Sequence, residues 1–297
     1  GNLRTALFAW LFARNQEGKF LLRVEDTDQK RLDKEAVKKI LETLEWVGLG
    51  VDEGVQFDEN KKITQTGEFG PYIQSQRLEI YQKYVEKLLA EKKAYYCFCS
   101  SKRLQKVREK QQAEKIPPMY DKKCRNLSEK EVQEKIKKGE KYVIRMKVPE
   151  DEIIKFTDKV FGDIEVNSNT VDDQVLIKTD GFPTYHLAVV VDDHLMQISH
   201  IFRGEEWLPS APKHILLYKF FGWKIPKFVH LPNVLGENKK KLSKRQGDVS
   251  VESFIEKGYL PEALVNFLAL LGWNPKSNQE IMSREELIKS FSLNGLH

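Results

Sequence analysis

The segment HLPNVLG at residues 230–236 is followed closely by the basic run KKKLSKR at residues 239–245. Lysine ammonium groups are compact charges that can follow the charge developing on a leaving pyrophosphate, and a flanking glycine lets such a loop move. A small hydroxyl, that of Ser243, lies between the cations. The pattern therefore favours phosphate chemistry. A short basic run is also typical of a solvated loop or of a non-specific nucleic-acid patch, so the rest of the sequence decides between these interpretations.

The chain has 297 residues, which is long enough for two or three domains, because single hydrophobic cores stop growing at about 250 to 300 residues. Its 49 Lys and Arg residues against 44 Asp and Glu leave a net charge of +5, which permits a polyanionic partner without requiring one. No apolar run of about 18 residues and no secretory leader occur, so a soluble, cytoplasmic protein without a membrane partner is expected. Three cysteines cannot all pair with one another, which fits a reducing compartment.

The first part of the chain, residues 1–92, alternates helical and strand patterns. Apolar residues at helical spacing predict a helix over 3–12, and the apolar run 20–24 predicts a short strand. Acidic residues, Glu25 among them, follow this strand directly. Carboxylates at the carboxyl end of a parallel strand lie where open α/β sheets bind ligands. Amphipathic patterns then predict helices over 35–47 and 78–89.

The middle segment, residues 93–182, is expected to form an inserted α+β domain. Ser128 and Glu131 have the spacing of a capping box and predict the start of a helix that Gly139 ends. The other elements expected here are a highly charged helix that runs to residue 115 and strands over 95–99, 142–147, 164–166 and 175–179.

Residues 183–232 return to the alternation of the first part. Helix, strand, helix and strand are predicted over 185–191, 200–203, 210–221 and 228–231. A second half of this kind after an insertion predicts a split nucleotide-binding fold of the α/β class. The last segment, residues 233–297, carries the basic run and helical patterns over 251–256, 261–271 and 284–291.

Several blocks along nearly the whole chain resemble the bacterial-type glutamyl-tRNA synthetases, which are class I aminoacyl-tRNA synthetases. The blocks keep the family's order and are RTALF (4–8), RVEDTD (23–28), GPY (70–72), PTY (183–185), DDH (192–194), RGEEW (203–207) and the stretch 230–245. The resemblance implies a split Rossmann-type class I synthetase catalytic domain. It also implies that the inserted domain binds the tRNA acceptor end and that the C-terminal helical region contacts the tRNA stem.

The resemblance assigns the nucleotide site to the basic run and to the RGEEW block. Lys241, Ser243 and Lys244 match the second class I signature, in which the second lysine stabilises charge moving onto pyrophosphate. Glu206 and Trp207 resemble residues that line the pocket for ATP and the aminoacyl-adenylate, together with Lys244. For Trp207 taken alone, packing in the core is the alternative.

The amino-acid site is expected around Arg203, which follows an apolar strand and should face a pocket. A planar guanidinium there would bind a carboxylate through two hydrogen bonds. The resemblance implies that Arg203 and Tyr185 hold substrate glutamate and that Glu25 binds its amino group. Taken alone, Tyr185 can be a core aromatic and Glu25 a surface carboxylate. Many family members have asparagine where this chain has Val189, so one polar contact to the substrate is left unassigned.

Cys97, Cys99 and Cys124 supply three soft ligands. Three thiolates prefer zinc, and a structural site needs a fourth ligand. Some bacterial relatives have a histidine two residues after the last cysteine, where this chain has Asn126, a poor ligand. In a related enzyme that modifies tRNA-Asp, a tyrosine four residues before that cysteine completes the site, which makes Tyr120 the expected fourth ligand. Buried cysteines without a metal are the alternative, and the histidines show no metal spacing.

The resemblance implies that ATP and L-glutamate form glutamyl-adenylate, with Mg²⁺ on the phosphates, and that tRNA-Glu then accepts the glutamyl group on its terminal adenosine. A monomer is expected. The alternatives are a truncated paralogue that glutamylates a modified base of tRNA-Asp and a non-catalytic tRNA-binding module. The chain begins at what would be the last two residues of the first class I signature, Gly1 and Asn2, and the family's anticodon-binding region should follow His297. The sequence is therefore expected to be part of a longer protein.

Overall fold

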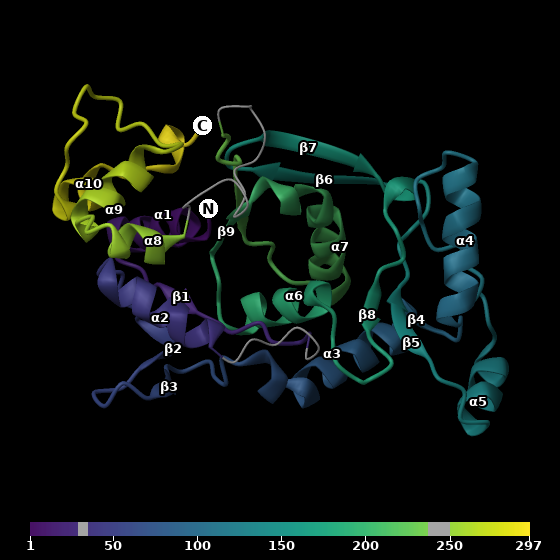
Figure 1. Cartoon of the computed structure of the whole chain (residues 1–297). Helices are drawn as coiled ribbons and strands as arrows, with labels where there is room; N and C mark the ends of the chain where they lie inside the picture. The colour runs from purple at the N-terminus through teal and green to yellow at the C-terminus, as the bar shows by residue number, and fades with distance from the viewer. Residues whose placement is uncertain (29–34, 237–249) are drawn as a thin grey trace.

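The computed structural model describes residues 1–28, 35–236 and 250–297 (Figure 1). The helices are α1 (Asn2–Asn15), α2 (Ala36–Trp46), α3 (Leu78–Ala90), α4 (Ser101–Ala113), α5 (Glu129–Lys137), α6 (Tyr185–Leu195), α7 (Ala211–Phe221), α8 (Val251–Glu256), α9 (Pro261–Leu270) and α10 (Arg284–Ser290). The strands are β1 (Leu21–Leu22), β2 (Glu53–Phe57), β3 (Ile63–Thr66), β4 (Ala94–Cys97), β5 (Val143–Met146), β6 (Ile153–Asp158), β7 (Gly162–Asn167), β8 (Val175–Ile177), β9 (His200–Gly204) and β10 (Lys227–Leu231).

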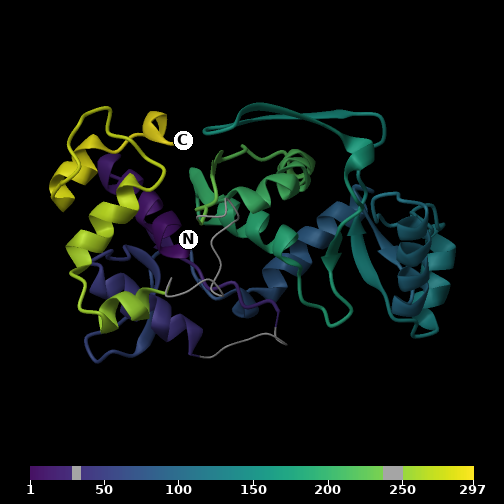
Figure 2. The same cartoon turned by 45° about the horizontal axis from the view of Figure 1, so that its top comes forward.

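The molecule is elongated, with α4 and α5 at one end and α8, α9 and α10 at the other (Figures 1 and 2). Between the ends lies a sheet with the strand order β7-β6-β10-β9. β9 and β10 are parallel and in register from His200 opposite Lys227 to Gly204 opposite Leu231, so both strands end at the same edge. The helix, strand, helix and strand predicted over 185–231 are thereby confirmed, and α6 and α7 bury their apolar residues in one core with Phe228.

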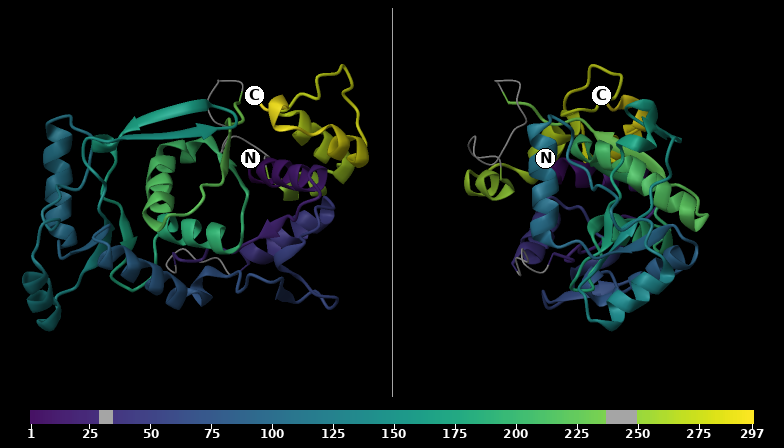
Figure 3. Two further views of the ribbon diagram at one scale, coloured as in Figure 1. Left: turned by 180° about the vertical axis from the view of Figure 1, so that it is seen from behind. Right: turned by 90° about the vertical axis from the view of Figure 1, so that its right-hand side faces the viewer.

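The hairpin of β6 and β7 belongs to this central sheet although its sequence lies in the middle segment. β6 is parallel to β10 and pairs with it where Phe228 lies opposite Asp158. The hairpin thus runs from the side of α4 toward the centre of the molecule, as the views from the front and from behind both show (Figure 3). The domain boundaries expected at residues 93 and 182 stay predictions, but one pairing in the structure crosses them.

A second sheet has the order β1-β2-β3 and packs near α2. The strand predicted over 20–24 is shorter than expected, because only Leu21 and Leu22 pair with β2, and Val24 forms an isolated bridge to Ile73. Gly54 has φ +112°, and a Cβ built on it would lie 2.1 Å from the carbonyl oxygen of Leu22. Close approach of β1 and β2 therefore requires glycine at this position.

The middle segment also forms its own antiparallel sheet, with the order β4-β5-β8. Its strands match those predicted over 95–99, 142–147 and 175–179. The predicted capping box is present at the start of α5, where Ser128 accepts from the backbone N–H of Glu131 and the Glu131 carboxylate accepts from that of Ser128. The helix ends before Gly139, which has φ +71°.

The C-terminal helices pack against α1. Leu7, Leu11, Val265, Trp273 and Phe291 are buried in one core that joins both ends of the chain. The helices predicted over 251–256, 261–271 and 284–291 are confirmed. Within the described residues, no helix combines the length and apolar character needed to cross a bilayer.

A buried carboxylate joins α6 to α3. The Asp192 side chain is fully buried and accepts from Gln74 Nε2 at 2.9 Å, Arg77 Nε at 2.7 Å and the Tyr81 hydroxyl at 2.8 Å. A buried charge is tolerated only when its lone pairs are satisfied in this way. Asp192 therefore fixes the two helices relative to each other.

We expect Asp192→Ala to lower the free energy of unfolding by about 3–5 kcal/mol, because it leaves the buried Arg77 charge without its partner. Urea unfolding followed by circular dichroism measures the change. Glu165→Ala is the control, since it breaks an exposed ion pair with Lys155 and should cost less than about 1 kcal/mol. Equal unfolding midpoints for the two variants would contradict this role of Asp192.

Candidate active site and cysteine cluster

Arg203 lies at the carboxyl edge of β9, with 7% of its side chain exposed. Its Nε donates to His230 Nε2 at 2.9 Å, and its Nη1 donates to His214 Nδ1 at 3.0 Å. The third nitrogen, Nη2, is buried and finds no hydrogen-bond partner among the described residues. Buried polar groups are normally paired, so this nitrogen has the capacity to donate to a further acceptor. A carboxylate is the acceptor that a guanidinium binds most strongly.

The two imidazoles that hold Arg203 have partners of their own. His230 Nδ1 lies 2.6 Å from the Asp158 carboxylate, and His214 Nε2 lies 3.0 Å from His186 Nδ1. Burial, reinforced by the nearby Lys213 and Arg203 charges, lowers the pKa of His186 to about 4. Burial and the Arg203 charge also lower the pKa of His214 well below its usual value. The His186 and His214 rings are therefore neutral at physiological pH and can accept hydrogen bonds.

Tyr185 lies at the start of α6, and its ring centroid is 4.4 Å from that of Trp207. Burial together with the Glu25 charge raises the pKa of Tyr185 to about 12, against the lowering effect of Arg203. The hydroxyl is therefore protonated at neutral pH. Both Glu25 and Arg203 are close enough to act on this hydroxyl, with opposite effects on its pKa.

Three carboxylates lie around the guanidinium of Arg23. This guanidinium is 2.8 Å from Glu25, 2.8 Å from Asp193 and 3.7 Å from Asp192. Burial raises the pKa of Asp193 to about 6, in spite of the Arg23 charge, so this carboxyl is ionised at neutral pH. Arg77 also pairs with Asp192, so the group contains two guanidinium groups and three carboxylates. Glu25 is the most exposed of the three, at 35% of its side chain, and can accept a further cation.

The nucleotide residues expected beside this site are described only in part. Glu206 and Trp207 lie in the short turn that follows β9. The Glu206 side chain folds back over Gly204, where a Cβ would lie 2.2 Å from one of its carboxylate oxygens. Lys241, Ser243 and Lys244 lie outside the described residues.

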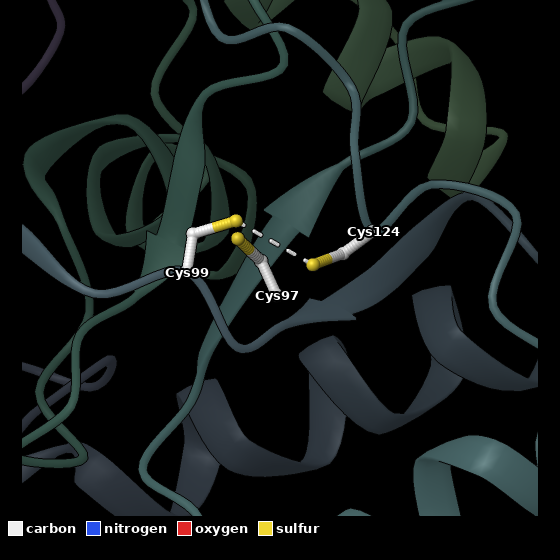
Figure 4. A group of neighbouring side chains, drawn as sticks. All are labelled: Cys97, Cys99 and Cys124. Atoms are coloured by element: carbon white, nitrogen blue, oxygen red, sulfur yellow. Dashed lines mark hydrogen bonds between the residues drawn. The ribbon is translucent and has the colours of Figure 1, made fainter. Parts of the chain in front are cut away.

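The cysteine cluster lies in the middle segment (Figure 4). The sulfur atoms of Cys97, Cys99 and Cys124 point toward one another and lie within 4.8 Å of one another, with 3.6 Å between those of Cys99 and Cys124. The Tyr120 hydroxyl lies 3.3 Å from the sulfur atoms of both Cys97 and Cys99 and accepts from the Cys124 backbone N–H at 3.0 Å. The four residues predicted as a ligand set are therefore together.

The geometry of this cluster fits a tetrahedral ion. With a Zn–S distance of about 2.3 Å, the sulfur atoms at two corners of a tetrahedron are about 3.8 Å apart, close to the observed separation. Hydrogen bonding with Cys124 is the main cause that lowers the pKa of Cys97, to about 4, and the same pairing raises that of Cys124. Two guanidinium groups lie beside the thiols, since Arg103 Nη1 lies 3.4 Å from Cys99 Sγ and hydrogen bonding with Arg145 contributes to lowering the pKa of Cys97.

Sequence reasoning missed the residues that hold Arg203. His186, His214, His230 and Asp158 come from four different elements, and their spacing in the chain suggests neither a metal site nor a catalytic motif. One signal was available, because a histidine inside the apolar strand of residues 227–231 is a buried polar group that needs a partner.

The chain is similar to known proteins in both sequence and structure. Residues 1–297 match the family model described as tRNA synthetases class I (E and Q), catalytic domain. A glutamate–tRNA ligase of Clostridioides difficile (strain 630) is 58% identical over 293 residues, which cover 99% of this chain and 59% of that protein. One of Alkaliphilus metalliredigens (strain QYMF) is 57% identical over 293 residues, with the same coverage of both chains.

The solved structures agree with these relatives. The crystal structure of a glutamate tRNA ligase from Elizabethkingia meningosepticum CCUG26117 in complex with its amino acid superposes with a TM-score of 0.91 at 42% identity, and covers 100% of this chain and 62% of that one. The chain thus spans about three fifths of the length of the curated relatives it matches. The expected α/β class I fold and the resemblance are confirmed, and the chain belongs to the family of class I tRNA synthetases (E and Q), catalytic domain.

Proposed function

We propose that the whole protein is a glutamate–tRNA ligase. A carboxylate oxygen of L-glutamate attacks the α-phosphorus of ATP, pyrophosphate leaves, and glutamyl-adenylate forms. A hydroxyl of the 3′-terminal adenosine of tRNA-Glu then attacks the activated carbonyl, and AMP leaves. No covalent intermediate with the enzyme is needed, so positioning and charge stabilisation supply the catalysis. The names of the similar proteins support glutamate over glutamine as the substrate.

The single observation that carries the proposal is the buried, unpartnered Nη2 of Arg203. A substrate carboxylate would accept from it and from the second N–H of Nη1. Across the pocket, Glu25 stands in an acidic group with one more carboxylate than guanidinium, which suits the substrate ammonium. The Tyr185 hydroxyl, which stays protonated, would donate a hydrogen bond to the substrate.

The nucleotide would bind at the edge where β9 and β10 end together, as ligands do in open α/β sheets. Trp207 and Glu206 would line the pocket for ATP and the adenylate. Lys241, Ser243 and Lys244 would act in catalysis, with Lys244 neutralising charge on the leaving pyrophosphate. Mg²⁺ bound with ATP would supply further charge neutralisation.

The tRNA acceptor end would bind the inserted domain, residues 93–182, and the stem would contact residues 233–297. The first of these surfaces carries a run of cations on α4, SKRLQKVREK, which suits phosphate contacts. Affinity for tRNA should therefore fall with salt. We further propose a monomeric, cytoplasmic enzyme.

Arg203→Ala in the full-length protein should raise the KM for glutamate about 100-fold, because a substrate carboxylate loses a charged hydrogen-bond partner in a buried pocket. The KM for ATP should change little. Glutamate-dependent exchange of pyrophosphate into ATP, with tRNA-Glu present, is the assay. Arg14→Ala, which breaks a half-exposed ion pair with Asp52, is the matched control. An unchanged KM for glutamate would remove Arg203 from the pocket.

Assays of the full-length protein without substitutions also distinguish the proposed function from its alternatives. A glutamate–tRNA ligase charges tRNA-Glu, whereas the paralogue glutamylates tRNA-Asp on a base, and a non-catalytic module supports no exchange. The similarity to proteins named glutamate–tRNA ligase over 99% of the chain favours the first.

We also propose that Cys97, Cys99, Cys124 and Tyr120 bind one structural zinc ion. The ion would join the end of β4 to the loop that carries Tyr120 and Cys124, and so stabilise the inserted domain. Tyrosine must lose its proton to bind, which burial opposes, since burial raises the pKa of Tyr120. The charge of the cation offsets this effect.

Protein purified without added metal should contain about one zinc per chain by elemental analysis, since three thiolates and a fourth ligand form a closed structural site. Chelation should impair tRNA charging more than the binding of glutamate or ATP. Tyr120→Phe should weaken zinc retention against a chelator, with Tyr142→Phe, a half-exposed tyrosine of the same domain, as control. Normal loading in Tyr120→Phe would leave the cysteines as ligands and exclude the tyrosine.

A further inference from the structure

Arg203 is the middle of a hydrogen-bonded chain that runs Asp158, His230, Arg203, His214 and His186. We propose that Asp158 and the two central imidazoles are positioning residues for the amino-acid pocket, which fix the Arg203 guanidinium and leave its full charge for the substrate carboxylate. This inference rests on the proposed role of Arg203 in binding glutamate.

The proton positions along the first half of the chain follow from chemistry. A guanidinium has only donors, so His230 Nε2, which faces Arg203 Nε at 2.9 Å, must carry a lone pair. The ring proton is then on Nδ1, which donates to the Asp158 carboxylate at 2.6 Å. Asp158 therefore selects the one tautomer of His230 that can hold Arg203.

The second half of the chain obeys the same logic. His214 Nδ1 faces Arg203 Nη1 and accepts from it, so the His214 proton is on Nε2 and points at His186 Nδ1. The donor-only Arg203 thus fixes the His214 tautomer, and His186 Nδ1 must carry a lone pair to accept the His214 proton. Two of the three guanidinium nitrogens are held, and the third is the one without a partner.

Neutral imidazoles suit this task better than carboxylates would. A carboxylate against Arg203 would form an ion pair and neutralise the charge that the substrate needs. Instead, the His230 ring lies between the Asp158 carboxylate and Arg203, so Asp158 orients His230 without contacting Arg203. Arg203, His214, His230 and Asp158 are all at most 7% exposed, so water does not compete for these bonds.

Asp158→Asn tests the tautomer directly, because the turn after β6 fixes how the introduced amide must lie. Asp158 Oδ1 accepts from the backbone N–H groups of Val160 and Phe161, at 2.9 and 3.0 Å, and an amide oxygen can keep both bonds. The amide nitrogen must then face His230, where it donates to Nδ1 and removes the acceptor that the His230 backbone N–H has at 3.3 Å in Asp158 Oδ2. The His230 proton moves to Nε2, where it opposes the Arg203 Nε–H.

In the full-length protein, Asp158→Asn should raise the KM for glutamate about tenfold, the scale of one lost hydrogen bond. The KM for ATP should stay within about twofold. Nitrogen chemical shifts of the His230 ring should report a proton on Nδ1 in the wild type and on Nε2 in the variant. A merely structural role for Asp158 would move neither the tautomer nor the glutamate KM selectively.

Two substitutions of His230 give a rescue test. His230→Leu keeps a buried side chain of similar size but removes the acceptor, so the glutamate KM should rise as in Asp158→Asn. His230→Gln can place its amide oxygen near the position of Nε2 and should restore the KM to within about threefold of wild type. His200→Leu, at the other end of β9 and away from Arg203, is the control and should leave the KM unchanged.

The outcomes separate this inference from the proposed function. If Arg203→Ala raises the glutamate KM but Asp158→Asn and His230→Leu do not, Arg203 binds glutamate without help from this chain, and the inference is overturned. If Arg203→Ala itself leaves the KM unchanged, the proposed pocket fails first. The inference is also overturned if His230→Gln is as impaired as His230→Leu, because a hydrogen-bond acceptor at this position would then make no difference.

Discussion

The candidate site depends on how one cation is held at the carboxyl edge of two parallel strands. Arg203 on β9 donates to His230 on β10, and the register of the two strands brings these residues side by side. A second contact, to His214 on α7, comes from the helix that follows β9 along the chain. A guanidinium fixed on two sides by neutral acceptors keeps its charge and presents its remaining nitrogen in one direction. The geometry of the proposed amino-acid site follows from this constraint.

A complementary constraint fixes the acidic side of the pocket. Asp192 and Asp193 are adjacent on α6, yet they serve different partners: Asp192 joins α6 to α3, and Asp193 pairs with Arg23 near the end of β1. This group has one more carboxylate than guanidinium, and Glu25 is its most exposed carboxylate. The Tyr185 hydroxyl feels both groups, since Glu25 raises its pKa and Arg203 lowers it. An amino acid with an ammonium and two carboxylates matches such an arrangement of opposite charges better than a neutral ligand would.

Local patterns predicted most elements and several site residues, because periodicity, caps and strand exits are properties of neighbouring residues. The capping box at Ser128, Arg203 at a strand end and the cysteine cluster are of this kind. The roles of Glu25 and Tyr185 needed the family resemblance. The pairing of β6 with β10 joins residues about seventy positions apart, and nothing in the sequence near Asp158 indicates its partner. The imidazoles that hold Arg203 were missed for the same reason, since their function exists only once four elements meet.

The hairpin of β6 and β7 belongs by sequence to the middle segment but contributes to the candidate site in the central sheet. Its residues lie within the segment expected to bind the tRNA acceptor end, but its first strand is part of the central sheet and ends at Asp158. That carboxylate is buried against His230, and Arg203 lies on the other side of the same ring. Because a buried hydrogen bond to an ionised group tolerates little displacement, the hairpin cannot shift relative to β10 without disturbing the ring that orients Arg203. The proposed amino-acid site would therefore be built from both sides of the expected boundary, with its geometry set by the pairing that joins them.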